Sequence, residues 1–239
     1  WSALGAVPVL SGGVSAWRKD TLREMGGFTA DTTHEDLDTT LRLHERFRRR
    51  KQPYRILYLP DPVLWTEVPH TWRGLYMQRK RWQRALYESL WRSRRMLFRP
   101  RYGTVGMLLM PYLLIYEAVG PFVEAASYVV TLVLLALGLV ETQILLAFLA
   151  VAGGLTAGIR LSGLILGLVY YDDRPIQDVL KLSAAALLEY WIYRPFLLLP
   201  RIHAFFEFLA GHTAHERALR QTRPGAPRAP ATPTETILI

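Results

Sequence analysis

The distribution of apolar and polar positions divides the chain near residue 103. Before that point short apolar runs alternate with charged and glycine-containing stretches, and after it long apolar segments follow one another. In the first part, an apolar run from Val7 leads to the glycine pair 12–13, a charged stretch at 16–25 and a second glycine pair at 26–27. This order predicts a strand, a turn and a short helix with a glycine C-cap.

Further elements are expected in the same part of the chain. Residues 36–50 place apolar side chains among charges at helical spacing, with acids at the start and bases at the end, which complements a helix dipole. Residues 55–60 and 63–68 have the character of short strands. Residues 1–103 are therefore predicted to form part of an α/β domain.

A basic and aromatic helix is predicted over residues 76–101. This stretch holds nine Lys or Arg residues against a single acid, Glu88, and contains no proline before Pro100. Arginine offers a planar fork of donors that fits phosphate oxygens, and an indole face stacks on the apolar face of a sugar ring or on a base. Arg81 and Trp82 are therefore a candidate pair for binding a phosphate and a sugar.

The apolar second part predicts an α-helical transmembrane bundle of four crossings over residues 104–200. Four segments carry this prediction, and the last two are long enough for a span of ~20 residues: 104–119, 121–140, 144–171 and 179–199. An even number of crossings leaves the basic run at 92–101 and the basic stretch after 201 on the cytoplasmic side. Charged residues and Pro121 interrupt the first two segments, so a hairpin, or one bent interfacial helix plus one span, is the alternative.

The C-terminal part is expected to lie outside the bundle. Residues 201–222 mix aromatic and basic side chains as an amphipathic interfacial helix does. Residues 223–239 are rich in Pro, Ala and Thr, and are predicted to be disordered.

Composition narrows the classes of function. The net charge of +9 arises in the first part, because residues 1–103 alone carry 20 Lys or Arg and 10 Asp or Glu. The chain has no cysteine, which excludes disulfides and thiolate metal sites within it. A nucleic-acid binder would also be basic and aromatic, but the apolar segments make a membrane the simpler source of this basicity. No nucleic acid is expected as a partner.

Asp36 is the candidate general base, because a carboxylate within hydrogen-bond reach of a hydroxyl can take its proton. The alternative is a solvated carboxylate at a helix N-terminus. A metal site made of His34, Glu35, Asp36 and Asp38 is disfavoured, since adjacent residues on one loop rarely converge on one ion.

Arg160 lies near the middle of the third apolar segment. A charge at the centre of a bilayer costs at least ~2.5 kcal/mol unless it is paired or lies in a wet cavity. Arg160 is therefore expected to pair with Glu117, Glu124 or Glu189, or to line a path through the bundle.

Taken in order, these features resemble the C-terminal part of a family 2 membrane glycosyltransferase, the group that includes cellulose, chitin, hyaluronan and poly-N-acetylglucosamine synthases. The glycine-containing steps at 11–13 and 26–28 resemble those before the acceptor site in this family. Residues 34–36 (His-Glu-Asp) stand where these enzymes have Thr-Glu-Asp. Residues 78–82 (Gln-Arg-Lys-Arg-Trp) fit the family pattern Gln-(Gln/Arg)-x-Arg-Trp in full. The resemblance covers about residues 5–220.

The resemblance implies a role for each matching residue. Asp36 would be the catalytic base and Glu35 its neighbour in the catalytic step. Gly12 and Gly13 would support the acceptor side of the site.

By the same resemblance, the helix with residues 78–82 closes the active site against the donor diphosphate and the acceptor sugar. The residues assigned to this binding are Gln78, Arg79, Arg81 and Trp82. Arg81 would neutralise charge on the departing nucleoside diphosphate, and Trp82 would stack on the acceptor sugar.

The resemblance further implies a GT-A-like catalytic domain, of which residues 1–103 would be the C-terminal part. A divalent metal, Mg²⁺ or Mn²⁺, would be held by an Asp-x-Asp pair expected before residue 1, so no metal ligand is expected in this chain. The chain is accordingly expected to be a fragment without the donor-binding half.

The predicted function is inverting transfer of a sugar from a nucleotide-sugar, expected to be UDP-linked, to a growing glycan. The expected partners are this donor, a glycan or lipid-linked acceptor, and membrane lipids. The expected location is the plasma membrane, with several crossings and the catalytic part on the cytoplasmic side. Processive extension is favoured because the spans follow the active-site helix, and a non-extending lipid-linked transferase is the alternative.

A rival from another class is a non-enzymatic membrane protein. In it, residues 1–103 form a cytoplasmic binding module, and the basic helix grips anionic lipid. This rival predicts that the substitution Asp36→Asn changes nothing.

Overall fold

The computed structural model describes residues 1–28, 35–57, 64, 66–171 and 175–211. The α-helices of this part are α1 (Lys19–Glu24), α2 (Glu35–Arg49), α3 (Trp72–Arg92), α4 (Met110–Tyr112), α5 (Gly120–Ala136), α6 (Thr142–Tyr171), α7 (Ile176–Leu188) and α8 (Arg194–Leu209). Two short 3₁₀ helices follow α3, namely η1 (Arg94–Met96) and η2 (Pro100–Tyr102). Three π-helical stretches connect the later helices, namely η3 (Val105–Leu109), η4 (Leu113–Val119) and η5 (Glu189–Tyr193).

The described residues contain no β-strand, so the α/β fold predicted for residues 1–103 is not confirmed. The segment after Val7 is bound by side chains of α2 instead of by a neighbouring strand. His44 Nε2 lies 2.8 Å from the carbonyl oxygen of Val7, and the Leu10 amide donates to Thr40 Oγ1 at 3.1 Å. A strand needs a paired neighbour for its backbone groups, and here α2 satisfies them. Of the strands predicted at 55–60 and 63–68, residues 58–63 and 65 lie outside the described part.

The first two helices form where the charge pattern predicts them. α1 is followed by Gly26 and Gly27, whose φ angles are 85° and 78°, so the predicted glycine stop is confirmed. α2 has Glu35, Asp36 and Asp38 in its first turn and arginines in its last turn. Both ends of α2 therefore complement the helix dipole.

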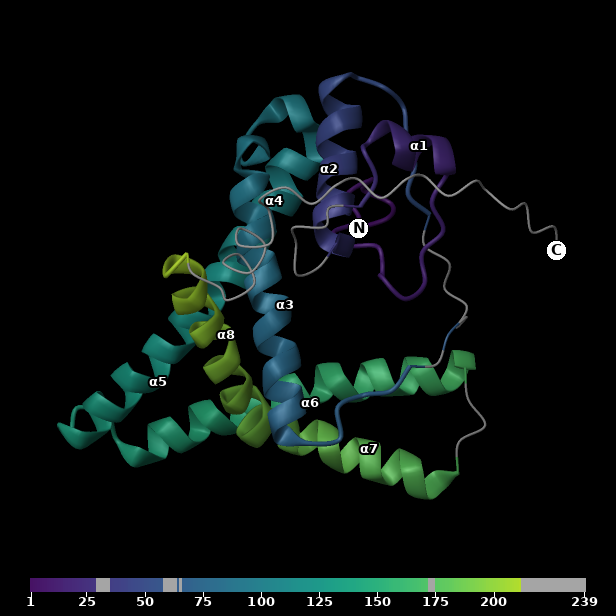
Figure 1. The fold of residues 1–239 in the computed structure, drawn as a ribbon. Helices are drawn as coiled ribbons and strands as arrows, with labels where there is room; N and C mark the ends of the chain where they lie inside the picture. Colours follow the sequence, from purple (N-terminus) through teal and green to yellow (C-terminus); the bar gives the residue numbers. More distant parts are fainter. Residues whose placement is uncertain (29–34, 58–63, 65, 172–174, 212–239) are drawn as a thin grey trace.

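α3 and α8 run side by side and parallel to each other (Figure 1). Aromatic rings meet at both ends of the pair: Trp72 lies 4.9 Å from Phe196, and Tyr87 lies 5.4 Å from Phe205, between ring centroids. Lys80 makes an ion pair with Glu207 at 2.6 Å between them. α8 is therefore the main packing partner of the helix that carries residues 78–82.

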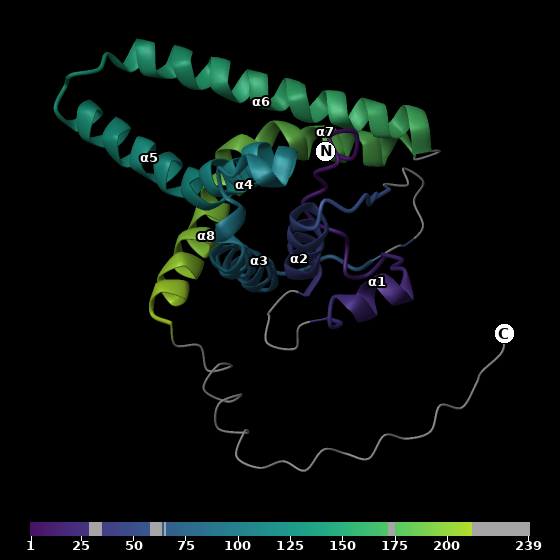
Figure 2. The same cartoon turned by 90° about the horizontal axis from the view of Figure 1, so that it is seen from above.

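The buried core lies where α2, α3, η1 and the first apolar helix (Val105–Ala136) meet. Its fully or nearly fully buried members come from all four: Leu41, Leu86, Leu90, Met96, Val105, Leu109 and Met110. α6 and α7 lie beside each other, set apart from α3 (Figure 2). η5 contacts α6, α7 and α8, so α8, which packs along α3, connects these long helices to the core around α2.

Three helices of the described part, not the predicted four, are long and apolar enough to cross a membrane: Val105–Ala136, Thr142–Leu168 and Ile176–Leu209. The segments predicted as two crossings at 104–119 and 121–140 form one continuous helix. Pro121 follows directly after the π-helical η4 and has no N–H to donate to the Glu117 carbonyl four residues earlier, but Gln83 and Arg201 donate to that carbonyl instead. The proline therefore does not separate two helices.

The third of these helices also contains the start of the segment predicted as an interfacial helix at 201–222. α8 begins at Arg194 and packs along α3, so residues 201–209 continue a helix that starts earlier. Residues 212–239, which include the predicted tail at 223–239, lie outside the described part.

Ion pairs join the apolar helices to one another. Arg160 pairs with Glu189 at 2.8 Å, which confirms one of the predicted partners. The other two acids, Glu117 and Glu124, are bound by Arg201 at 2.9 Å and by Arg194 at 2.6 Å. Glu117 precedes Glu124 in the chain, whereas Arg201, the partner of Glu117, follows Arg194. This order is expected of two antiparallel helices. These three pairs compensate charges that would be costly in an apolar environment.

Candidate functional site

Asp36 lies in the first turn of α2 and is half-buried. Its Oδ1 accepts a hydrogen bond from the Leu37 amide at 2.7 Å, which fixes the carboxylate at the helix N-terminus. A negative charge is favourable there because the first amides of the helix point toward it. Glu35 precedes it and is exposed. His34 lies outside the described residues.

Gly12 lies directly against the Asp36 side chain. A β-carbon added at Gly12 would come within 3.6 Å of Asp36 Oδ2. The neighbouring Gly13 faces a different side chain, since its added β-carbon would lie 3.5 Å from Leu64 Cδ2. The structure therefore brings together two of the predicted site residues, Gly12 and Asp36, and leaves the Oδ2 side of the carboxylate without a side chain from Gly12.

Asp38 has a structural role. It is 2% exposed and forms ion pairs with Arg42 at 3.2 Å and with Arg92 at 3.4 Å. Because Arg92 ends α3, this contact holds the start of α2 beside the C-terminal end of α3. In the described part of the chain, no three His, Cys, Asp or Glu side chains group closely enough to hold a metal ion.

The side chains of residues 78–82 divide between two sides of α3. The helix begins after Thr71, whose Oγ1 accepts from the Gly74 amide at 3.0 Å. Lys80 turns toward α8 and its ion pair with Glu207. Arg81 is exposed and makes no hydrogen bond or ion pair with any other described residue. A guanidinium with all its donors unused is suited to binding an anion.

Trp82 and Arg79 form a stacked pair. Trp82 is 43% exposed, and the Arg79 guanidinium carbon lies 4.5 Å from its ring centroid. Arg79 also donates to the Tyr193 hydroxyl at 3.5 Å, which connects it to η5. A cation above an indole fixes the orientation of the ring. Gln78 is half-buried one turn before Trp82, so it lies on the same face of the helix.

A buried polar network behind this face was not predicted from the sequence. Gln83 Nε2 donates to the Glu117 carbonyl oxygen at 2.7 Å, and Arg201 Nε donates to Gln83 Oε1 at 2.9 Å. Tyr87 donates to the carbonyl oxygen of Ala118 at 3.1 Å. The π-helical η4 supplies both of these carbonyls. The one sign of this network in the sequence is Gln83, a polar residue on an otherwise apolar face of α3.

His44 lies beside the core and is buried enough to stay neutral. Burial lowers the pKa of His44 to about 4, and the nearby Arg48 acts in the same direction, against the hydrogen bond to Val7. His44 therefore serves as a neutral hydrogen-bonding residue between α2 and the segment after Val7.

The predicted residues form two groups on neighbouring helices. Glu35, Asp36 and Gly12 lie at the start of α2, and residues 78–82 lie along α3. Within the described residues, no hydrogen bond or ion pair joins these two groups directly. The first group offers a carboxylate whose Oδ1 is held and whose Oδ2 lies against a glycine, and the second offers an exposed indole and an arginine, Arg81, that has no partner among the described residues. These are the parts needed to bind an anion and a sugar ring and to accept a proton.

Comparisons with known proteins agree with this chemistry. The family model described as glycosyl transferase family group 2 matches residues 1–159. The poly-beta-1,6-N-acetyl-D-glucosamine synthase of Staphylococcus epidermidis is 31% identical over 118 residues, which cover 49% of this chain and 26% of the relative. The enzyme of the same name from Staphylococcus aureus (strain COL) is 35% identical over 89 residues, which cover 37% of this chain and 20% of the relative.

The chain thus spans about a quarter or less of the length of these curated relatives. No solved structure matches it. The family model covers well over half of the chain and includes both groups of candidate site residues. The chain belongs to glycosyl transferase family group 2.

Proposed function

We propose that this chain carries the acceptor side of a membrane glycosyltransferase that extends a glycan from a nucleotide-sugar. The observation that carries the proposal is the position of Asp36. Its Oδ1 is held by the Leu37 amide, and its Oδ2 lies against Gly12, which has no side chain to cover that oxygen. A carboxylate fixed in this way is ready to take a proton from a hydroxyl that enters beside Gly12.

The proposed reaction is a single displacement. The acceptor hydroxyl gives its proton to Asp36, and its oxygen forms a bond to the anomeric carbon of the donor sugar. The bond from that carbon to the donor diphosphate breaks, and the nucleoside diphosphate leaves with the electron pair. Attack from the side opposite the leaving group inverts the anomeric carbon.

We assign the leaving group and the acceptor ring to α3. Arg81 has all its donors unused among the described residues, so it can meet the charge that develops on the diphosphate. Trp82 offers an exposed indole face for the acceptor sugar, and its stacking on Arg79 holds that face in place. Gln78 lies one turn away, on the same face, as a hydrogen-bonding partner for either ligand.

The donor is proposed to be UDP-linked, and the sugar is proposed to be N-acetylglucosamine. The support for this sugar is the printed name of the relatives, poly-beta-1,6-N-acetyl-D-glucosamine synthase. The three candidate spans support a membrane location. We further propose, from the family resemblance and not from the number of spans, that the catalytic residues lie on the cytoplasmic side and that extension is processive. Among the described residues, no three His, Cys, Asp or Glu side chains could hold the divalent metal that the resemblance implies.

The test is incorporation of labelled sugar from a panel of UDP-sugars by membranes containing the protein expressed from its complete coding sequence. The proposal predicts incorporation from UDP-N-acetylglucosamine into material that grows with time. Incorporation from another donor only would correct the sugar. No incorporation from any donor, with the protein folded and inserted, would favour the non-enzymatic binding module instead.

A further inference from the structure

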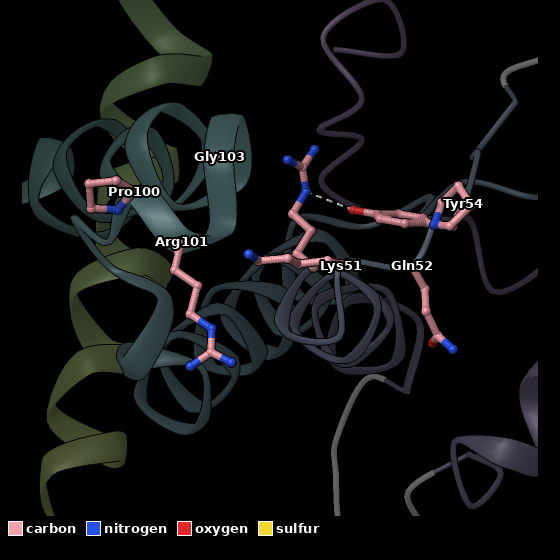
Figure 3. A pocket seen from close by; sticks show the side chains of 8 residues that line it. Lys51, Gln52, Tyr54, Pro100, Arg101 and Gly103 are labelled. Atoms are coloured by element: carbon pink, nitrogen blue, oxygen red, sulfur yellow. Dashed lines mark hydrogen bonds between the residues drawn. The ribbon is translucent and has the colours of Figure 1, made fainter.

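A pocket of about 390 Å³ lies between the end of α2 and the segment that leads into the first apolar helix. This volume is within the ~300–1,000 Å³ range of small-ligand pockets. Residues 48–54 supply one wall, and residues 100–103 supply the other (Figure 3). The pocket is separate from the two groups of candidate transfer residues.

The lining of this pocket is cationic. Arg48, Lys51 and Arg101 all line it, and no acid does so among the described residues. Figure 3 shows Lys51 reaching from the end of α2 toward the segment that carries Arg101. Three cations that share one open space repel one another unless an anion lies between them. The chemistry of this lining therefore fits a phosphate group.

Two of these cations are held in place by the protein. Arg48 donates from Nε to the Tyr54 hydroxyl at 2.9 Å, and from Nη2 to the Gly5 carbonyl at 2.8 Å and to Thr104 Oγ1 at 3.0 Å. Gly103 makes room for this guanidinium, because a β-carbon added there would lie 2.5 Å from Arg48 Nη1. A side chain that is already held in position loses less conformational entropy when it binds a ligand.

Arg101 is held in a similar way. Its Nη2 donates to the carbonyl oxygen of Arg49 at 3.1 Å, in the last turn of α2. This contact uses a small part of its donors and complements the negative end of the helix dipole. The remaining donors of Arg101 stay available to a ligand.

Lys51 stands in an unusual backbone conformation. Its φ is 55°, and it follows α2 at the position where glycine commonly ends a helix. The Gln52 amide donates to the Phe47 carbonyl at 3.0 Å, and the Lys51 amide donates to the Arg48 carbonyl at 3.1 Å, which completes this helix end. A lysine here costs backbone energy that glycine would not. Its ammonium makes no hydrogen bond or ion pair with another described residue.

The position of the pocket along the chain favours a lipid as the source of the phosphate. Arg101 and Gly103 come just before the candidate span Val105–Ala136. Met107 and Leu108, at the start of that helix, are 45% and 49% exposed. Lipid phosphates lie at the edge of the hydrocarbon layer, beside the start of such a helix, and basic side chains attract anionic lipid there.

We propose that the pocket of Arg48, Lys51 and Arg101 binds the phosphate of an anionic lipid headgroup, whose acyl chains lie along Met107 and Leu108 on the exposed face of the first apolar helix. This binding would fix the end of α2, and with it the Asp36 helix, against the membrane surface. The proposal concerns a site apart from sugar transfer and does not rest on that activity.

The test is native mass spectrometry of the protein in a non-ionic detergent with phosphatidylglycerol, phosphatidylcholine or inorganic phosphate. The key variant is Lys51→Gly, because glycine suits the backbone at this position, so any loss of binding is not a loss of fold. The matched control is Lys19→Gln, which removes one charge from an exposed lysine of α1. Thermal unfolding without lipid accompanies each variant.

The wild-type protein is expected to retain phosphatidylglycerol in preference to phosphatidylcholine. Each cation near anionic lipid contributes about 1 kcal/mol to binding. Lys51→Gly should therefore lower the affinity for phosphatidylglycerol about fivefold, and Lys51→Gly with Arg101→Gln about thirtyfold. Lys19→Gln should leave the affinity unchanged. Equal loss in the control, or full displacement of phosphatidylglycerol by millimolar inorganic phosphate, would overturn the lipid site.

Discussion

Gly12 and Asp36 lie in contact although 24 positions separate them in the sequence, and a β-carbon on Gly12 would come within 3.6 Å of Asp36 Oδ2. That distance is an ordinary van der Waals contact, so alanine fits there without displacing the carboxylate. A longer side chain would occupy the space beside Oδ2. This contact makes the size of residue 12 a direct probe of the proposed acceptor site.

We predict that Gly12→Ala folds normally and lowers sugar transfer about tenfold or less, whereas Gly12→Leu lowers it by more than ~100-fold, which corresponds to more than ~2.7 kcal/mol of barrier. Steady-state transfer by membranes containing each variant measures this. Gly154→Leu is the control, because a β-carbon there would meet nothing within 4 Å among the described residues. Equal effects of Gly12→Leu and Gly154→Leu would show that the space beside Asp36 has no special role.

Arg81→Ala is expected to separate activity from stability. Arg81 is exposed and makes no hydrogen bond or ion pair with the other described residues, so the free energy of unfolding should change by less than ~0.5 kcal/mol. Loss of a group that meets developing charge should lower kcat/KM by about 10²–10³-fold. Kinetics with varied donor concentration, beside thermal unfolding, measures both quantities. Arg73→Ala, at an exposed position of the same helix, should leave transfer unchanged, and an equal loss there would contradict the assignment.

Gln83→Leu is expected to destabilise the protein. It leaves Arg201 Nε and the Glu117 carbonyl without this partner in a buried site, at a cost of about 1–3 kcal/mol. Denaturant unfolding in detergent micelles measures the free energy. Gln143→Leu, an exposed position in α6, is the matched change and should have little effect. If both variants unfold at the same denaturant concentration, the network has no stabilising role.

His44 makes the stability of the protein dependent on pH. Burial lowers its pKa in the folded state to about 4, whereas an unfolded chain has a histidine pKa of about 6.5. Between these values the unfolded state binds the proton and the folded state does not. The full stability is therefore present above pH ~6.5 and falls by about 1.4 kcal/mol per pH unit down to pH ~4.

Denaturant unfolding at a series of pH values measures this slope, which totals about 3 kcal/mol over the window. His44→Gln removes the titrating group and should flatten that part of the profile. An unchanged slope in His44→Gln would assign the pH dependence to other groups.

The two helices that carry the candidate residues were predictable because local signals agree with their tertiary contacts. α2 has its acids and bases at the ends that the dipole favours, and α3 follows an N-cap threonine, Thr71. The predicted basic helix nevertheless ends early, at Arg92 and not at residue 101. Met96 and Tyr102 are buried, at 0% and 5% exposure, and two 3₁₀ turns fold this segment back so that both reach the core. No helix-breaking residue marks that bend before Pro100 in the sequence.

The described residues show neither the predicted strands nor a fourth candidate crossing, and both differences have a physical reason. Apolar alternation near Val7 predicts a strand, but α2 satisfies the backbone groups of that segment through His44 and Thr40. Glu117 and Glu124 predict an interruption between two spans, but Arg201 and Arg194 neutralise them, so the helix continues. These pairings join positions 70 and 84 residues apart, and the sequence pattern holds no local sign of them.

The central claim is that the Asp36 carboxylate accepts the acceptor proton. Its most direct test is sugar incorporation by the protein expressed from its complete coding sequence, with Asp36→Asn beside Asp20→Asn. Asp20 is an exposed acid in the first turn of α1, so its substitution removes the same charge at a comparable helix start. The account predicts that Asp36→Asn loses incorporation by at least ~100-fold at unchanged donor binding, while Asp20→Asn retains it. Incorporation by Asp36→Asn at the wild-type rate would contradict the account.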